Sequence, residues 1–280
     1  MLSRRHFLAV SSVVAAASPS RLHGRASVQV GVCDWNLKKT AQVDAVALAA
    51  SIGFDAVEVS LGRDERDGKL PLDNEALLAS YRRSAAENKI KICSTCLDIL
   101  HKHYMKNDPL GAKYTSDAIR ITKALDARLI LLPYFGKGAL DTVESRSYVA
   151  DLLRDLAKEA AAAKVILALE NTNSAKENAF ILDRVGSDWV RVYYDVGNST
   201  RNGYNVPEEI RWLGKERIVQ VHFKDNGYLG DGPIAFEPIA SALNDINYEG
   251  VINLETNAPS GNVAADMKRN LAFTRTLMKA

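Results

Sequence analysis

The 280-residue sequence has little of several features that mark common classes of protein. Its three cysteines are too few for a disulfide framework. Lys and Arg number 36 against 34 for Asp and Glu, and so small an excess of positive charge argues against a nucleic-acid binder that neutralises phosphates. What the chain does have, 47% apolar and 25% charged residues, is the composition of an ordinary globular protein and excludes a disordered or collagen-like chain.

Two of the cysteines, Cys93 and Cys96, form a CxxC pair inside the apolar run IKICSTCL. At this spacing on a strand, the two side chains point to opposite faces. The pair is therefore predicted to pack in the core rather than to bind zinc or to carry out redox chemistry.

The N-terminal residues 1–26 read MLSRRHFLAVSSVVAAASPSRLHGRA and have the order of an export signal. The pair Arg4 and Arg5 precedes an apolar stretch, residues 7–17, that is too short to span a bilayer, and small residues follow. The pattern resembles a twin-arginine (Tat-type) signal peptide, which carries folded proteins across a bacterial membrane. We expect residues 27–280 to form the mature protein, in the periplasm or otherwise exported, with no membrane partner; an uncleaved anchor is the alternative.

Eight short apolar runs in the mature chain are rich in Val, Ile and Leu and mostly do not alternate with polar residues, which is typical of strands buried on both faces. The runs are 28–34, 55–60, 90–97, 128–135, 165–171, 190–196, 218–225 and 250–256. The amphipathic segments between and after them are 43–52, 74–88, 110–125, 148–163, 175–185, 207–213, 236–246 and 263–278.

This alternation, with no linker, predicts an α/β fold: one (β/α)8 TIM barrel over residues 27–280. A doubly wound sheet is the alternative, but the turn after the first run lacks the glycine-rich motif of that fold.

Polar residues end the later runs, where a barrel of this kind carries its active site. The fifth, sixth and eighth runs end in Glu170, Asp195 and Glu255, and the seventh carries His222. Three carboxylates and an imidazole from consecutive strands suit one divalent cation, with Mn²⁺ or Mg²⁺ preferred and Co²⁺ or Zn²⁺ as alternatives. Without a cation the carboxylates would repel one another, and at least one would be driven to protonate.

These segments resemble the sugar phosphate isomerase/epimerase family with a xylose isomerase-like TIM barrel. The resemblance is carried by GFDAVEVS (53–60), LILLPYFGKG (129–138), LALENT (167–172), YYDVGNS (193–199), VHFKDNGYLGDG (221–232) and GVINLET (250–256). It implies that the metal ligands are Glu170, Asp195, His222 and Glu255. It also implies that Glu170 and Glu255 act as the acid/base pair on opposite faces of the sugar.

One position departs from many members of that family. The chain has Asn198 where many relatives have a histidine three residues after the aspartate. The motif DVGN (195–198) resembles the branch that contains L-ribulose-5-phosphate and L-xylulose-5-phosphate 3-epimerases and hexulose-phosphate isomerases.

The function that the resemblance implies is a metal-dependent isomerase acting on a ketose or keto-sugar through an enediolate. One glutamate would remove the proton, and the other would return it. Candidate substrate contacts are Asn198, Lys224, His103, Glu58 and Trp35. Each has a structural alternative, such as a surface ion pair for Lys224 or a solvated loop for His103. Glu58 could reach the barrel mouth or orient a ligand.

The glycines of LGDG (229–232) could present backbone N–H groups to an anion, with a plain tight turn as the alternative. An exported enzyme would meet few sugar phosphates, because these are retained in the cytoplasm. An unphosphorylated carbohydrate is therefore the favoured small-molecule partner. The sequence leaves a homo-oligomer open.

Two other functions remain open. A metal-dependent lyase or dehydratase acting on a keto-sugar, keto-glycoside or ketoinositol would also need a metal-stabilised enediolate. A non-catalytic periplasmic carbohydrate-binding barrel would not need two flanking carboxylates. A DNA-repair endonuclease of the same superfamily would need a histidine-rich three-zinc site. Of the five histidines only His101, His103 and His222 lie outside the signal, so this function is disfavoured.

Overall fold

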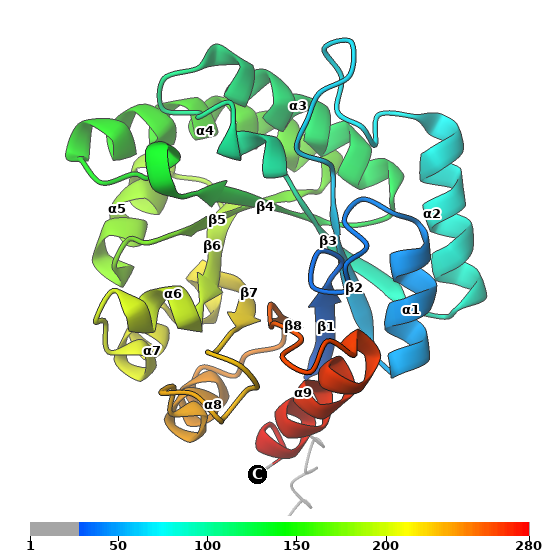
Figure 1. The fold of residues 1–280 in the computed structure, drawn as a ribbon. Helices are drawn as coiled ribbons and strands as arrows, with labels where there is room; N and C mark the ends of the chain where they lie inside the picture. The colour runs from blue at the N-terminus through cyan, green and yellow to red at the C-terminus, as the bar shows by residue number, and fades with distance from the viewer. Residues whose placement is uncertain (1–27, 280) are drawn as a thin grey trace, which may run out of the picture.

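Eight parallel strands close into a barrel in which each strand pairs with its sequence neighbours and the last pairs with the first (Figure 1). The structure, a computed structural model, describes residues 28–279. Its strands are β1 (Gln29–Cys33), β2 (Ala56–Ser60), β3 (Lys91–Cys96), β4 (Leu129–Tyr134), β5 (Ile166–Asn171), β6 (Val190–Asp195), β7 (Ile218–Phe223) and β8 (Val251–Leu254). Each lies inside its predicted range, and the predicted TIM barrel is confirmed.

Helices follow the strands and cover the outside of the barrel (Figure 1). They are α1 (Asp44–Ile52), α2 (Glu75–Glu87), α3 (Pro109–Ala124), α4 (Val143–Ala163), α5 (Ala175–Val185), α6 (Val196–Arg201), α7 (Val206–Arg217), α8 (Phe236–Asp245) and α9 (Val263–Leu277). Two short 3₁₀ helices, η1 (Asp98–His101) and η2 (Gly136–Gly138), lie after β3 and β4. Among the described helices, none has the length and hydrophobicity that a membrane span requires. The expected signal, residues 1–26, lies outside the described residues.

Local sequence accounts for the helix ends and for two departures from expectation. A capping box between Ser174 and Glu177 starts α5, and Gly186, with a φ of 66°, ends it. Helix α4 begins at Val143, ahead of the predicted residue 148, because a capping box at Thr142 starts it earlier. The short α6 was not predicted from the sequence. The side chain of Asp195, the last residue of β6, accepts a hydrogen bond from the Asn198 N–H and so fixes where α6 begins.

The interior of the barrel is partly apolar and partly polar. One buried group contains Cys96, Leu129, Leu131, Ala168 and Tyr193. The polar interior side chains, each at most 3% exposed, are Glu58, Ser94, Gln220 and Asn253. Branched apolar side chains usually fill such a barrel, so buried polar groups here call for a specific reason.

The prediction that Cys93 and Cys96 point to opposite faces was wrong. A register shift in the β2–β3 pairing pairs Val57 with Ile92 and then Glu58 with Ser94, so Cys93 lies in a β-bulge. The Cys93 thiol consequently contacts interior polar side chains, while Cys96 belongs to the interior apolar group. All three cysteines are free, as expected of packing residues.

Candidate active site

Four side chains from consecutive strands meet at the carboxyl end of the barrel. The His222 Nδ1 atom lies 3.0 Å from Glu170 Oε1, 3.7 Å from Glu255 Oε2 and 3.9 Å from Asp195 Oδ2. One ligand atom from each residue lies within 4.8 Å of the others. The structure therefore brings together the ligand set that the sequence indicated, with donor atoms near enough to share one ion.

Strand register sets this meeting point. Asp195 of β6 pairs directly with His222 of β7, and the backbone N–H of Glu255 donates to Phe223 O at 3.0 Å. Parallel strands in a closed barrel end on the same rim, so the polar residues that end the apolar runs converge. Glu170, Asp195 and His222 are buried, and Glu255 is partly exposed.

The two carboxylate oxygens of Asp195 differ in their hydrogen bonding. Its Oδ1 accepts from the Asn198 N–H at 2.7 Å and so starts α6, whereas its buried Oδ2 has no hydrogen-bond donor. Burial raises the pKa of Asp195 to about 8; the positive charge of Lys224 opposes this rise, and the charges of Glu170 and Glu255 add to it. A cation would satisfy the bare oxygen and keep the carboxylate ionised, so these residues fit a divalent metal.

Lys224 lies against the carboxylates of the cluster. Its Nζ donates to Glu255 Oε2 at 2.5 Å and lies 3.5 Å from Asp195 Oδ2. Burial would lower the pKa of Lys224, but the surrounding carboxylates outweigh it and hold the pKa above the ordinary value. Gly197 gives the lysine stem its space, because a Cβ there would lie 3.0 Å from Lys224 Cβ. Lys224 is thus a partly buried cation of the site rather than a surface ion-pair partner.

A cavity with two lobes opens beside the cluster. The larger lobe, about 510 Å³, includes Glu170 and Asn198, and the smaller, about 370 Å³, extends toward α6. Both lobes are lined by Trp35, Arg201, Lys224 and Glu255. Cavities of this size hold small organic ligands, so the mouth has room for a monosaccharide.

Three of the predicted substrate contacts line this cavity. Trp35 donates from Nε1 to Glu255 Oε1 at 3.3 Å, and its ring meets the His222 ring in a T-shaped arrangement. Asn198 donates weakly to Glu170 Oε1 at 3.5 Å. Together with Lys224, these side chains touch both the cluster and the space next to it.

The structure places two other predicted contacts away from the cavity. Glu58 does not reach the barrel mouth: it is fully buried below His222, with its Oε1 3.2 Å from His222 Nε2. The His103 ring pairs with Asp108 at 2.7 Å and lies 3.6 Å from Glu65, and it lines neither lobe. At these positions neither side chain lines the cavity for direct sugar contact, and Glu58 instead pairs with His222, as its structural alternative expected.

Among the cavity-lining residues that sequence reasoning missed are His101 and Arg201. His101 ends η1, stacks on Phe135 and lines the larger lobe. Arg201 ends α6, lines both lobes and donates to Asn198 Oδ1. Had a helix been predicted after the sixth strand, the three-residue spacing from Asn198 to Arg201 would have placed both on one face.

The glycines of the LGDG segment serve the protein's own carboxylate. The backbone N–H groups of Gly230 and Gly232 both donate to Asp225 Oδ2 at 3.2 Å. The tight-turn alternative therefore holds here, and these N–H groups are already engaged without an external anion.

Comparisons with known proteins agree with the barrel fold. The sequence pattern of the family described as xylose isomerase-like TIM barrel matches residues 46–277. The Escherichia coli (strain K12) protein named "Putative L-ribulose-5-phosphate 3-epimerase SgbU" is 30% identical over 259 residues, which cover 81% of this chain and 88% of that protein.

Two solved structures have a similar fold. A D-psicose 3-epimerase in the presence of D-fructose aligns with a TM-score of 0.77 and 17% identity, covering 90% of this chain and 100% of that one. The E. coli 3-keto-D-glucoside 4-epimerase YcjR aligns with a TM-score of 0.73 and 18% identity, covering 89% and 98%. At these identities the likeness shows the fold alone.

Proposed function

Because this chain belongs to the xylose isomerase-like TIM barrel family, we propose that it is a metal-dependent sugar epimerase or isomerase acting on a ketose or keto-sugar. The observation that carries the proposal is the buried Asp195 Oδ2, which accepts no hydrogen bond and lies within a cluster of four ligand side chains. A buried carboxylate oxygen without a donor is costly, and a divalent cation would satisfy it. The adjoining cavity supplies space for the sugar.

The proposed ligands are Glu170, Asp195, Glu255 and the Nδ1 atom of His222. We propose Mn²⁺, because three oxygens and one imidazole suit this ion; Mg²⁺, Co²⁺ and Zn²⁺ also match the donor set. When bound, the cation would polarise a sugar carbonyl and the neighbouring hydroxyl, which makes the C–H between them more acidic.

Glu170 and Glu255 are the proposed acid and base. They come from β5 and from the end of β8, so three strand positions around the barrel separate them. One glutamate removes a proton from one face of the sugar, and return by the other to the opposite face gives the epimer. Return to the adjacent carbon instead gives the aldose–ketose isomer. Lys224 and Trp35 both donate to Glu255 and hold its carboxylate at the rim.

We propose an unphosphorylated substrate. Residues 1–26 resemble an export signal, and an exported enzyme would meet few sugar phosphates. The N–H groups of Gly230 and Gly232, which could have received a phosphate, instead bind Asp225. The name of the E. coli relative points to a 5-phosphate, so the phosphorylated and free sugars form the decisive pair of compounds.

The experiment is proton exchange in D₂O, followed by NMR. L-ribulose, L-ribulose 5-phosphate and a panel of ketoses and keto-glycosides are incubated with the protein and Mg²⁺, or with EDTA. We expect metal-dependent deuterium incorporation beside the carbonyl and an epimer or isomer of a free sugar. Release of a leaving group would establish the lyase alternative. Sugar binding without exchange would favour a binding barrel, and no exchange across the panel with metal bound would refute the proposal.

Replacement of Lys224 by methionine should have two opposite effects. Removing the ammonium from beside Glu255 and Asp195 should tighten metal binding about tenfold, since a competing cation is lost. The KM should rise about tenfold, because Lys224 lines both lobes. Isothermal titration and steady-state kinetics measure both. Lys38→Met, at the rim of the smaller lobe, controls for the loss of one positive charge. Unchanged metal affinity in Lys224→Met would refute the competition.

A further inference from the structure

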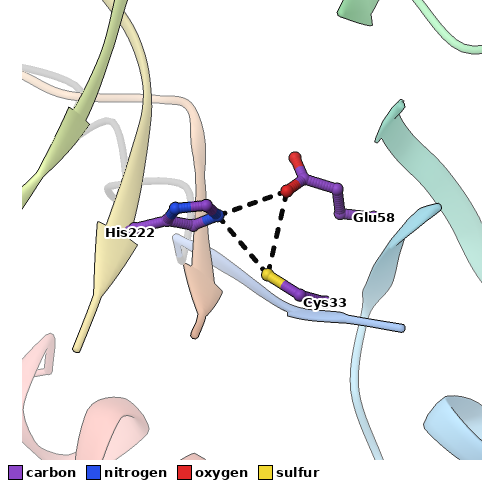
Figure 2. A group of neighbouring side chains, drawn as sticks. All are labelled: Cys33, Glu58 and His222. Carbon is purple, nitrogen blue, oxygen red and sulfur yellow. Dashed lines mark hydrogen bonds and ion pairs between the residues drawn. The ribbon is translucent and has the colours of Figure 1, made fainter. Parts of the chain in front are cut away.

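A fully buried carboxylate lies directly beneath the candidate metal site. Figure 2 shows Cys33, Glu58 and His222 facing one another from three different strands. All three are 0% exposed. Glu58 Oε1 lies 3.2 Å from His222 Nε2, and the Cys33 thiol lies 3.4 Å from that nitrogen. The ligand role proposed above uses the other nitrogen of His222, so it leaves this contact unexplained.

The second oxygen of Glu58 is held firmly from several sides. Its Oε2 accepts from Tyr193 OH at 2.9 Å, from the Ser94 hydroxyl and from Asn253 Nδ2 at 3.4 Å. Gly31 of β1 makes room for this arrangement, because a Cβ there would lie 1.9 Å from Asn253 Oδ1. With Oε2 saturated by donors, Oε1 is the oxygen that faces His222.

This contact decides which nitrogen of the histidine is available to a ligand. In a neutral imidazole only one ring nitrogen carries a proton, and the other has the lone pair. Both ring nitrogens of His222 face a carboxylate: Nε2 lies 3.2 Å from Glu58 Oε1, and Nδ1 lies 3.0 Å from Glu170 Oε1. Only Nδ1 also faces Asp195 and Glu255, so a cation held by the cluster would replace a proton on Nδ1, while Glu58 accepts the proton on Nε2.

We propose that Glu58 is a positioning residue that holds the Nε2–H of His222, so that Nδ1 is the atom that binds the cation. The inference rests on the proposed metal site. Carboxylates that accept from a ligating histidine fix its ring orientation and raise its basicity. This role also explains why the barrel interior is polar at this level: Ser94, Tyr193 and Asn253 hold the Glu58 carboxylate under the His222 ring.

The rival interpretation is a second metal centre made by Cys33, Glu58 and His222, whose ligand atoms also lie close together. One observation favours positioning: Glu58 Oε2 already has three hydrogen-bond donors, which leaves Oε1 alone to face His222. The two interpretations predict different nitrogen and sulfur ligation.

The decisive measurement uses the full mature protein loaded with ¹¹³Cd²⁺ and carrying ¹⁵N-labelled histidine. We expect ¹¹³Cd–¹⁵N coupling at Nδ1 of His222 and a slowly exchanging proton on Nε2. Coupling at Nε2, or a cadmium shift typical of thiolate ligation, would overturn the inference and leave the proposed function intact. Failure to bind any divalent cation would overturn both.

Two variants separate positioning from general support of the fold. Glu58→Gln should weaken cation affinity about 10–100-fold and speed exchange of the Nε2 proton. Gln220→Met removes a buried amide from the same polar layer, where it donates to Ser94 and Tyr193, and should leave affinity near that of the wild type. Equal weakening in both variants would assign Glu58 a merely structural role. If Glu58→Gln does not fold, the ¹¹³Cd–¹⁵N spectrum of the wild type still distinguishes positioning from a second metal centre.

Discussion

Sugar interconversion should fall by about 10²–10⁴-fold when either Glu170 or Glu255 is replaced by glutamine, because such losses accompany removal of a general acid or base. Glutamine retains a carbonyl oxygen that can ligate a metal, but it cannot accept or return the sugar proton. Both residues lie within the cluster, on β5 and after β8, beside the cavity. Product formation and deuterium incorporation by the metal-loaded variants measure the effect.

Single variants also report the face on which each glutamate acts. Glu170→Gln leaves the Glu255 carboxylate, so deuterium should still enter the epimer whose C–H faces Glu255, although the other epimer no longer forms. The converse pattern is expected for Glu255→Gln. Glu249→Gln, just before β8 at the opposite end of the barrel, should behave like the wild type. Near-normal interconversion in both site variants, with metal content retained, would exclude the proposed pair.

The barrel and the four-residue cluster could be predicted because both depend on strong, local signals. Strands buried on both faces form uninterrupted apolar runs, and a parallel barrel brings the ends of those runs to one rim. Predicting the positions of Glu170, Asp195 and Glu255 therefore required only the correct strand ends. For His222 the prediction also required that its side chain point inward, which the pairing with Asp195 provides.

Other features depend on tertiary geometry that a sequence pattern does not carry. The bulge at Cys93 shifts the β2–β3 register and turns that thiol inward. The choice between His101 and His103 depends on η1, which points the first into the cavity and leaves the second paired with Asp108. Glu58 was recognised as a polar residue on a strand, but only the packed interior shows that it lies beneath His222.

Metal-free protein should lose stability as pH rises from about 6 to about 8.5. Burial raises the pKa of Asp195 to about 8, and, although burial opposes it, the charges of Glu170 and Glu58 raise the pKa of His222. These two residues therefore bind protons more tightly in the folded state than in the unfolded chain, where the pKa is near 3.9 for aspartate and near 6.5 for histidine. The stability from Asp195 is full below about pH 3.9 and is lost as pH rises toward 8. The His222 contribution is full below about pH 6.5 and is lost as pH rises through its raised folded-state pKa.

A divalent cation and the substitution Asp195→Asn should each reduce this pH dependence, for different reasons. The cation stabilises the ionised carboxylate that burial disfavours, so saturating Mg²⁺ should restore the stability lost at about pH 8.5. Asparagine removes the buried charge, so metal-free Asp195→Asn should be more stable than the metal-free wild type at that pH by roughly 2–5 kcal/mol and should gain less from Mg²⁺. Urea unfolding of both proteins at about pH 6 and about pH 8.5, in EDTA and in Mg²⁺, measures these stabilities. Parallel pH profiles for the two proteins in EDTA would show that Asp195 does not carry the buried charge, and the ligand role proposed for its bare Oδ2 would then lose its physical basis.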